Sequence, residues 1–261
     1  MSRAIRMLAA ATVVGGLALS GLMTAGAASA SIHGSGTHGV GSWSFGPHTG
    51  SPAVGRITAA TTSNRDFAGY LTGVTAGSAT SSAASFTVPK LSCTTANRFI
   101  APQVGVTANQ SKTFSAAGVS IGCTKGKAVY FPFLVANGAE ADYTVHFSAG
   151  DVINLSASVT TSGTTVQVTD VTKNVTKKLT GAGASATGAG MGDGGWTING
   201  TLLGVPNFGT LTFTSCRIDG KALASGNPSG YLRANSAGLV QIAPGPLSPA
   251  GTAFTTYYNH S

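Results

Sequence analysis

Side chains that could carry acid–base chemistry are scarce in this chain. Asp and Glu together number 7 among 261 residues, and Glu140 is the only glutamate. Glu140 lies in a short turn at 137–141, where a glutamate is normally solvated. A paired-carboxylate glycosidase is possible but has no support in the spacing. The aspartates fall near predicted turns or strand ends, where Asp often caps backbone groups: Asp66, Asp142, Asp151, Asp170, Asp193 and Asp219.

Nucleophilic and metal-assisted hydrolysis find equally little support. A Ser/His/Asp triad would have to use His146, in the middle of a predicted strand, or the penultimate His260, and no Gly-x-Ser-x-Gly turn accompanies either. The sequence has no His-Glu-x-x-His motif and no paired-cysteine motif. Three N-terminal histidines could hold a metal weakly, but we interpret them as incidental polar residues: His33, His38 and His48. We expect no metal and no other cofactor.

The composition favours short strands over helices. Only 8% of the residues are charged, against roughly 25% in an ordinary soluble domain, and 37 are glycine. Long amphipathic helices use Glu, Lys, Arg and Leu, whereas β-branched residues with Gly-rich turns are typical of strands. The formal net charge of +8 comes from scattered Lys and Arg. We interpret these cations as a solvated surface, and we expect no nucleic-acid partner.

Apolar residues recur with a period close to two from residue 64 onward, and no segment keeps a helical period. Pro132 makes the aromatic-rich segment 128–135 an edge or bulged strand. The glycine- and alanine-rich segment 181–195 is predicted to be a long loop. Together the strands indicate one all-β domain, a sandwich at 63–261. We predict strands at 67–73, 84–88, 98–106, 113–121, 128–135, 142–147, 152–160, 164–170, 174–179, 194–199 and 208–216, and near 222, 238–243 and 252–258.

The N-terminus has the features of a secretory signal peptide. Arg3 and Arg6 precede an apolar run at 8–23, and Ala-Ser-Ala at 28–30 matches the small-x-small cleavage pattern. The run is short for a membrane anchor, so we expect cleavage after Ala30, secretion, and no membrane span in the mature chain. Residues 31–62 are mostly Gly, Ser, His, Thr and Ala, which predicts a flexible linker.

Three cysteines leave one without a partner in the chain. Export permits a disulfide, and Cys93 and Cys123 enclose two consecutive predicted strands, so we predict that these two are bonded. Cys216 is in phase with Thr212 and Thr214 and out of phase with Phe213, so its burial stays open.

Several segments, in order, resemble the glutamic peptidases (the eqolisin family). The similarity spans about 64–258, and its order and spacing are more specific than any single motif. In that family an aromatic residue is followed three positions later by the catalytic Glu, and here Trp196 is followed by Asn199. The other similar segments are Asn-Arg-Asp-Phe-Ala-Gly-Tyr at 64–70, Ala-Ser-Phe-Thr-Val-Pro at 84–89, Gln-Val-Gly-Val at 103–106, Thr-Phe-Ser-Ala-Ala-Gly-Val at 113–119, Ser-Ala-Gly-Asp-Val-Ile at 148–153, Phe-Gly-Thr-Leu-Thr-Phe at 208–213 and Leu-Ser-Pro-Ala-Gly-Thr-Ala-Phe at 247–254.

The resemblance implies a concanavalin-like antiparallel sandwich and an acid endopeptidase ancestry. Those enzymes use Glu as general base and the amide of Gln to stabilise the oxyanion. The positions that match this pair are Asn199 and Ala116, and neither a neutral amide nor a methyl group can replace a general base or an oxyanion donor. We therefore expect no catalytic residue of the family type.

Three functions follow. The first is that of a secreted, non-catalytic protein that binds peptide, protein or glycan, and we expect a monomer. The second is an acid endopeptidase that uses other groups; a concanavalin-like carbohydrate enzyme is a third. Five aromatic residues could line the former substrate groove, although ordinary core packing is the alternative for each: Phe67, Tyr130, Phe131, Phe133 and Trp196.

Overall fold

The computed structural model describes residues 39–40, 62–109, 112–198 and 201–260. These residues form strands almost throughout, with one short 3₁₀ helix, η1 (Leu223–Gly226). The strands are β1 (Gly39–Val40), β2 (Thr62–Asn64), β3 (Phe67–Gly73), β4 (Thr80–Thr87), β5 (Arg98–Ala108), β6 (Thr113–Thr124), β7 (Lys127–Ala136), β8 (Ala139–Asp142), β9 (Val152–Val159), β10 (Thr164–Asp170), β11 (Val175–Gly181), β12 (Ala186–Ile198), β13 (Thr201–Leu202), β14 (Thr210–Ile218), β15 (Lys221–Ala222), β16 (Ser229–Ala234), β17 (Val240–Pro244) and β18 (Phe254–Tyr258).

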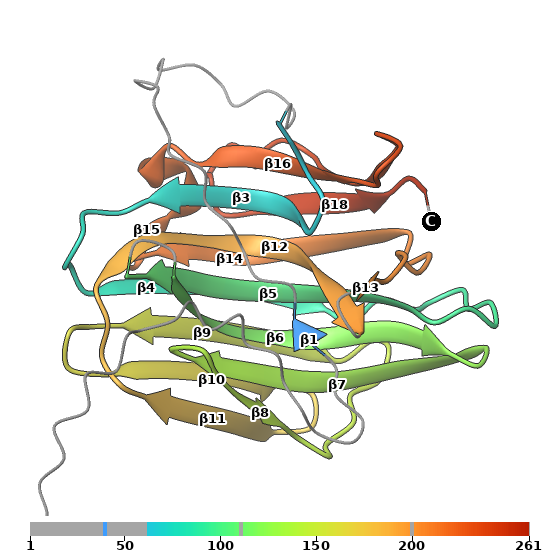
Figure 1. The fold of residues 1–261 in the computed structure, drawn as a ribbon, viewed down its shortest axis with the longest axis horizontal. Coiled ribbons are helices and arrows are strands. Elements are labelled where there is room, and N and C mark those ends of the chain that lie inside the picture. Colours follow the sequence, from blue (N-terminus) through green and yellow to red (C-terminus); the bar gives the residue numbers. More distant parts are fainter. Residues whose placement is uncertain (1–38, 41–61, 110–111, 199–200, 261) are drawn as a thin grey trace, which may run out of the picture.

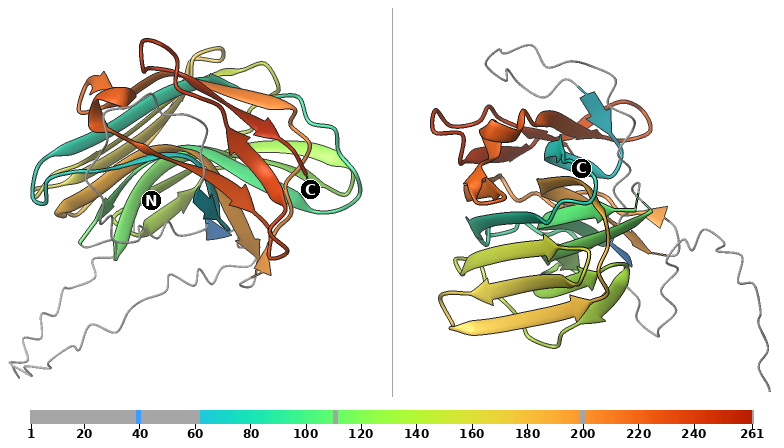
Figure 2. Two further views of the ribbon diagram at one scale, coloured as in Figure 1. Left: turned by 90° about the horizontal axis from the view of Figure 1, so that it is seen from above. Right: turned by 90° about the vertical axis from the view of Figure 1, so that its left-hand side faces the viewer.

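The strands form two stacked layers that belong to one continuous hydrogen-bonded ladder (Figures 1 and 2). The front layer has the order β8-β7-β6-β5-β12-β3-β16. The ladder continues through β16 and β17 into the back layer, which has the order β17-β18-β14-β4-β9-β10-β11. These pairings are antiparallel, so the prediction of an all-β antiparallel sandwich is confirmed.

The main core fills the space between the two layers. Alternate residues of the strands enter it, which is the pattern that a strand with one buried face produces. Phe86 and Phe213 of the back layer, for example, are buried there together with Val104 and Met191 of the front layer. The opposite residues of each strand form the outer faces, and the outer face of the front layer carries a second apolar cluster.

The central strand β12 corrects the prediction of a loop at 181–195. Residues 186–195 pair with β5 on one side and, over 188–194, with β3 on the other. Glycines are needed here because neighbouring groups occupy the space where side chains would stand. A Cβ on Gly190 would collide with the side chain of Leu71, and one on Gly192 would lie 2.8 Å from the ring of Phe67. The glycines therefore indicate close packing at this strand and not a loop.

Two other strand predictions need comment. Residues 143–148 are not a strand, because β8 ends at Asp142 and the chain then leaves the front layer. Their apolar alternation reflects packing at the edge of the core, where Phe147 is buried. Pro132 pairs with Val119 of β6, and β8 pairs with β7 only from Phe133 onward. Pro132 therefore lies where β7 has a single neighbour, as expected of an edge position.

The structure confirms the predicted disulfide and shows where the third cysteine lies. Cys93 and Cys123 form a disulfide, with their Cα atoms 5.5 Å apart. Cys216 is a free, fully buried cysteine. A bulge explains why its sequence phase was uninformative: the pairing of β14 with β4 shifts between Thr214 and Arg217, and Ser215 has a φ of 52°. The extra residue turns Cys216 into the core.

The N-terminal predictions lie mostly outside the described residues. The signal peptide at 1–30 falls entirely outside them, and of the linker at 31–62 only β1 and Thr62 are described. β1 pairs with the end of β12, with Gly39 opposite Thr197 and Val40 opposite Trp196. Within the described ranges, no helix is long and apolar enough to cross a membrane.

Gly190→Ala tests the packing around β12. The added methyl would meet the side chain of Leu71 and would stand 2.5 Å from the backbone oxygen of Tyr70, which cannot move aside without breaking the sheet. We expect the variant to lose about 1–3 kcal/mol of unfolding free energy, measured by urea denaturation. Gly73→Ala on β3 is the control, because a Cβ there meets nothing within 4 Å. Equal stabilities of the two variants would contradict this account of β12.

Candidate functional site

Four aromatic rings meet on the outer face of the front layer. Ring centroids of Phe99, Phe131 and Phe133 lie 5.9, 5.9 and 6.3 Å from that of Trp196. The planes are tilted or nearly perpendicular, which is a favourable arrangement for aromatic pairs. We call these four rings the aromatic cluster. Ala101, Ala116 and Val135 pack with it, and Trp196 and Phe133 are fully buried.

Three of the five predicted groove residues are therefore brought together: Phe131, Phe133 and Trp196. Phe67 lies on the same outer face but farther along, on β3, where its ring covers Gly69 and Gly192 and it packs with Leu71. Tyr130 points the other way, into the main core, and burial raises the pKa of its hydroxyl.

Phe99 belongs to the aromatic cluster although the sequence did not single it out. It lies two residues before Ala101 on β5, and both pack in the cluster. The alternation of this strand would have placed Phe99 and Ala101 on one face, but β5 is buried on both faces, so the pattern did not say which face was the outer one.

The ladder fixes which residues lie level with Ala116. Gly105 of β5 is opposite Ala116 of β6, and Gly190 of β12 is opposite Gly105. On the other side Val135 of β7 is opposite Ala116, and Glu140 of β8 is opposite Val135. This row, which we call the Ala116 row, crosses the outer face from β12 to β8.

Asn199 lies outside the described residues. The residue of β12 that belongs to the Ala116 row is Gly190, eight residues before the strand ends at Ile198. A base and an oxyanion donor must flank one peptide bond. The residue of β12 that could face a group at position 116 is therefore Gly190.

Glu140 occupies a place that the sequence did not predict. It lies on β8 and not in a turn, half-buried, and two strands away from Ala116 in the same row. Two strand spacings put the two Cα atoms about 10 Å apart. Glu140, the only glutamate of the sequence, therefore lies in the same row as Ala116, the position that matches the family's Gln.

A buried titratable group lies within β12. Asp193 is fully buried, and neither carboxylate oxygen has a hydrogen-bond partner among the described residues. Burial raises the pKa of Asp193 to about 7, and the nearby Thr256 hydroxyl and Arg233 guanidinium only partly offset this. Arg233 is also fully buried and donates to the carbonyl of Leu203 at 2.8 Å; burial lowers its pKa to about 10, against the opposing effect of Asp66 and Asp193.

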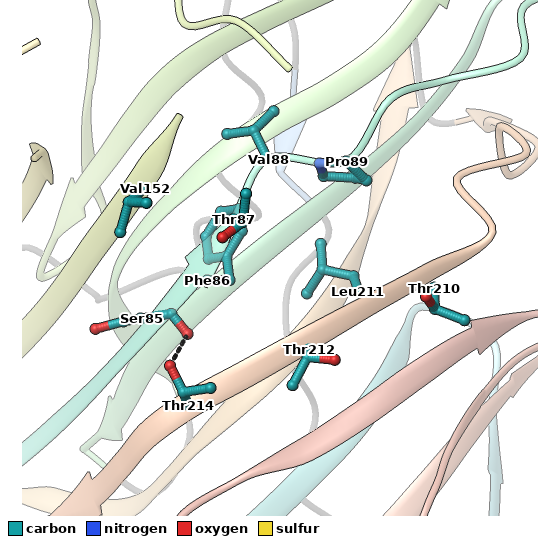
Figure 3. A pocket seen from close by; sticks show the side chains of 10 residues that line it. All are labelled: Ser85, Phe86, Thr87, Val88, Pro89, Val152, Thr210, Leu211, Thr212 and Thr214. Atoms are coloured by element: carbon teal, nitrogen blue, oxygen red, sulfur yellow. Dashed lines mark hydrogen bonds between the residues drawn. The ribbon is translucent and has the colours of Figure 1, made fainter. Parts of the chain in front are cut away.

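A separate cleft lies on the outer face of the back layer, between β4, β9 and β14 (Figure 3). It has a volume of about 380 Å³, and hydroxyl groups of Ser85, Thr87, Thr212 and Thr214 line it beside apolar groups. The Thr214 hydroxyl donates to the backbone carbonyl of Ser85 at 3.3 Å. Its lining contains no charged side chain, so it can offer hydrogen bonds but no general acid or base.

The part of the chain that the structure describes contains no set of metal ligands. No three or more His, Cys, Asp or Glu side chains gather there in a way that could hold an ion. The N-terminal histidines His33, His38 and His48 lie outside the described residues.

The fold is a concanavalin-like antiparallel sandwich. Residues 65–241 match the family described as the Peptidase A4 family. The chain therefore belongs to this family, the eqolisin or glutamic peptidase family. No curated protein sequence is significantly similar to the chain.

Solved structures of the family share the fold at low sequence identity. Scytalido-glutamic peptidase with a transition-state-analogue inhibitor has a TM-score of 0.60 and 16% identity, covering 76% of this chain and 100% of its own. SCP-B, an eqolisin in complex with the tripeptide Ala-Ile-His, has a TM-score of 0.58 and 16% identity over the same shares. Aspergilloglutamic peptidase from Aspergillus niger has a TM-score of 0.53 and 18% identity, covering 62% of this chain and 99% of its own.

Asp193→Asn tests the effect of the buried carboxyl on stability. The folded pKa of about 7 is above the ordinary value of 3.8, so the folded protein binds the proton more tightly than the unfolded chain. The stability that proton binding to Asp193 gives the folded protein is fully present below pH 4. It is lost as the pH rises through 7, by up to about 4 kcal/mol. Relative to the wild type, Asp193→Asn should therefore gain stability as the pH rises from 4 to 8.

The measurement is urea unfolding of both proteins at several pH values in that range. Asp219→Asn, at an exposed turn, is the matched control for the removal of one carboxylate. A constant difference in stability between Asp193→Asn and the wild type would show that Asp193 is ionised in the folded protein throughout this range.

Proposed function

We propose that this protein is a secreted, non-catalytic member of the glutamic peptidase family that binds peptide on the outer face of its front layer. The observation that carries the proposal is the Ala116 row. Between β12 and β6 it consists of Gly190, Gly105 and Ala116. None of these side chains can accept or donate a proton or a hydrogen bond.

The chemistry of the family explains why this row matters. Its reaction needs a general base to activate water and a donor to stabilise the oxyanion. Loss of one oxyanion donor alone typically lowers the rate about a hundred- to a thousandfold. Without the general base, no group is left to activate the attacking water. Introducing an acid at Gly190 is also sterically opposed, because Leu71 and the backbone of Tyr70 fill the space above its Cα.

The aromatic cluster favours peptide over glycan as the ligand. A sugar ring stacks best on a flat, exposed aromatic face, whereas Trp196 is fully buried and its neighbours contact it at steep angles. Half-buried Phe131 and Leu203 at its margin can instead receive apolar side chains. SCP-B of the same family has been solved with a bound tripeptide.

Secretion is proposed from the N-terminal sequence, with support from the disulfide. The basic start, apolar run and cleavage pattern are those of a signal peptide. The Cys93–Cys123 bond agrees with an oxidising compartment, because disulfides are rare in the cytosol.

An acid endopeptidase is the second candidate, and one observation favours it. Glu140 lies in the Ala116 row, separated from Ala116 by Val135. A carboxyl group on a long side chain at this edge could in principle activate water. Against this, its Cα is about 10 Å from position 116 by strand spacing, on the side opposite to the strand that carries the base in the family.

Digestion of casein by the purified mature protein from pH 2 to pH 7 distinguishes the two candidates. We expect no cleavage above the background rate, because the Ala116 row supplies neither base nor oxyanion donor. An active eqolisin such as scytalido-glutamic peptidase is the positive control, and Glu140→Gln is the matched variant. Cleavage that resists serine and metal inhibitors and disappears in Glu140→Gln would overturn the non-catalytic proposal and establish the second candidate.

A further inference from the structure

Two polar side chains beside the aromatic cluster have no hydrogen-bond partner among the described residues. Gln103 on β5 is fully buried, and both its amide nitrogen and its amide oxygen are unpaired. Ser120 on β6 is fully buried too, and its hydroxyl is unpaired. An unpaired buried polar group costs roughly 1–3 kcal/mol, and native proteins contain few of them. These two side chains therefore call for an explanation.

The ladder places both groups on the outer face of the front layer. Gln103 lies opposite Gly118 of β6 and Gly192 of β12. Its amide nitrogen sits over Gly194, where a Cβ would collide with it. Ser120 is two residues from Gly118 and so shares its face. Gln103 and Ser120 thus stand at neighbouring levels of adjacent strands.

Aromatic rings close this polar site from the side of β7. Phe133 is opposite Gly118, and its ring lies against the Cα of that glycine. Phe131 is opposite Ser120 and is only half-buried. A ligand group would reach Gln103 only if the Phe133 ring moved away from Gly118, whose backbone would then form the floor of the site.

The chemistry of the two groups identifies what would fill that space. A primary amide presents donors and an acceptor side by side, and a backbone peptide group presents one acceptor and one donor that complement them. The Ser120 hydroxyl can serve in either role. The cluster residues carry no charge, so nothing at this point selects a charged ligand group.

We infer that Gln103, assisted by Ser120, is the recognition site for a backbone peptide group of an extended ligand, whose apolar side chain enters among the rings of the aromatic cluster. This inference rests on the proposed function and assigns it a specificity-determining residue. The unpaired amide is then a cost in the free protein that the bound peptide offsets.

Gln103→Leu is the informative variant, because leucine has a similar size and no unmet hydrogen bonds. We expect it to raise the urea midpoint of unfolding and to weaken peptide binding at least tenfold. Ser120→Ala should weaken binding by a smaller factor, about two- to fivefold. Gln167→Leu on the outer face of the back layer is the matched control and should leave binding unchanged.

The probes are Ala-Ile-His and an acetylated, amidated hexapeptide of Leu and Phe, with binding measured by calorimetry on the full mature chain. If the wild type binds a probe and Gln103→Leu binds it equally well, the inference fails while the proposed function stands. A lower urea midpoint with unchanged binding would make Gln103 a structural residue. If the wild type binds neither probe up to millimolar concentration, the proposed function fails, and this inference fails with it.

Discussion

The close approach of β3, β5 and β12 is the constraint on which the front layer depends. Gly69 and Gly192 face each other with φ of 151° and 156°, a backbone region that other residues rarely adopt. A Cβ on Gly69 would lie 2.6 Å from the Cα of Gly192. Because β3 and β12 carry glycine at this level, the ring of Phe67 can lie over Gly69 and Gly192. The amide nitrogen of Gln103 on β5 lies over Gly194 of β12 for the same reason.

This packing also bears on the chemistry. A strand that must be glycine in order to let its neighbours close over it cannot project a catalytic carboxylate from the same positions. At Gly190 the space for such a side chain is taken by Leu71, which lies directly opposite. In the proposed non-catalytic protein, the close packing of the outer face and the absence of an acid at Gly190 therefore have the same structural cause.

Much of the fold was predictable from local sequence, and the exceptions have a common cause. Strands with one apolar face, such as β9 and β10, follow the alternation closely, with every second residue buried. The first part of β12, residues 186–193, was missed because many of its residues are glycine, which has no side chain and so shows no apolar alternation. Cys216 was ambiguous because a single bulge at Ser215 reverses the phase within one strand.

The candidate site was harder to predict because it depends on register between distant strands. The spacing of Trp196 and Asn199 resembles the family motif, yet it is a local feature and does not say what lies across the sheet. Pairing of β12 with β5, and of β5 with β6, places Gly190 level with Ala116. A one-residue change in register would move side chains to the opposite face, so only the complete ladder identifies the positions that could act together.

Asp193 and Gln103 are both buried, but the costs of burying them differ in kind. Asp193 has Thr256 and Arg233 nearby, whereas Gln103 has no hydrogen-bond partner among the described residues. The cost of Asp193 depends on pH, because a carboxyl with a pKa near 7 is neutral in acid and then needs far less solvation. An amide such as Gln103 does not titrate, so no change of pH relieves its unmet hydrogen bonds. Protonation in acid therefore lowers the cost of burying Asp193 within β12. The cost of burying Gln103 among the aromatic rings is offset only by a hydrogen-bonding partner, and in our proposal that partner is a peptide group.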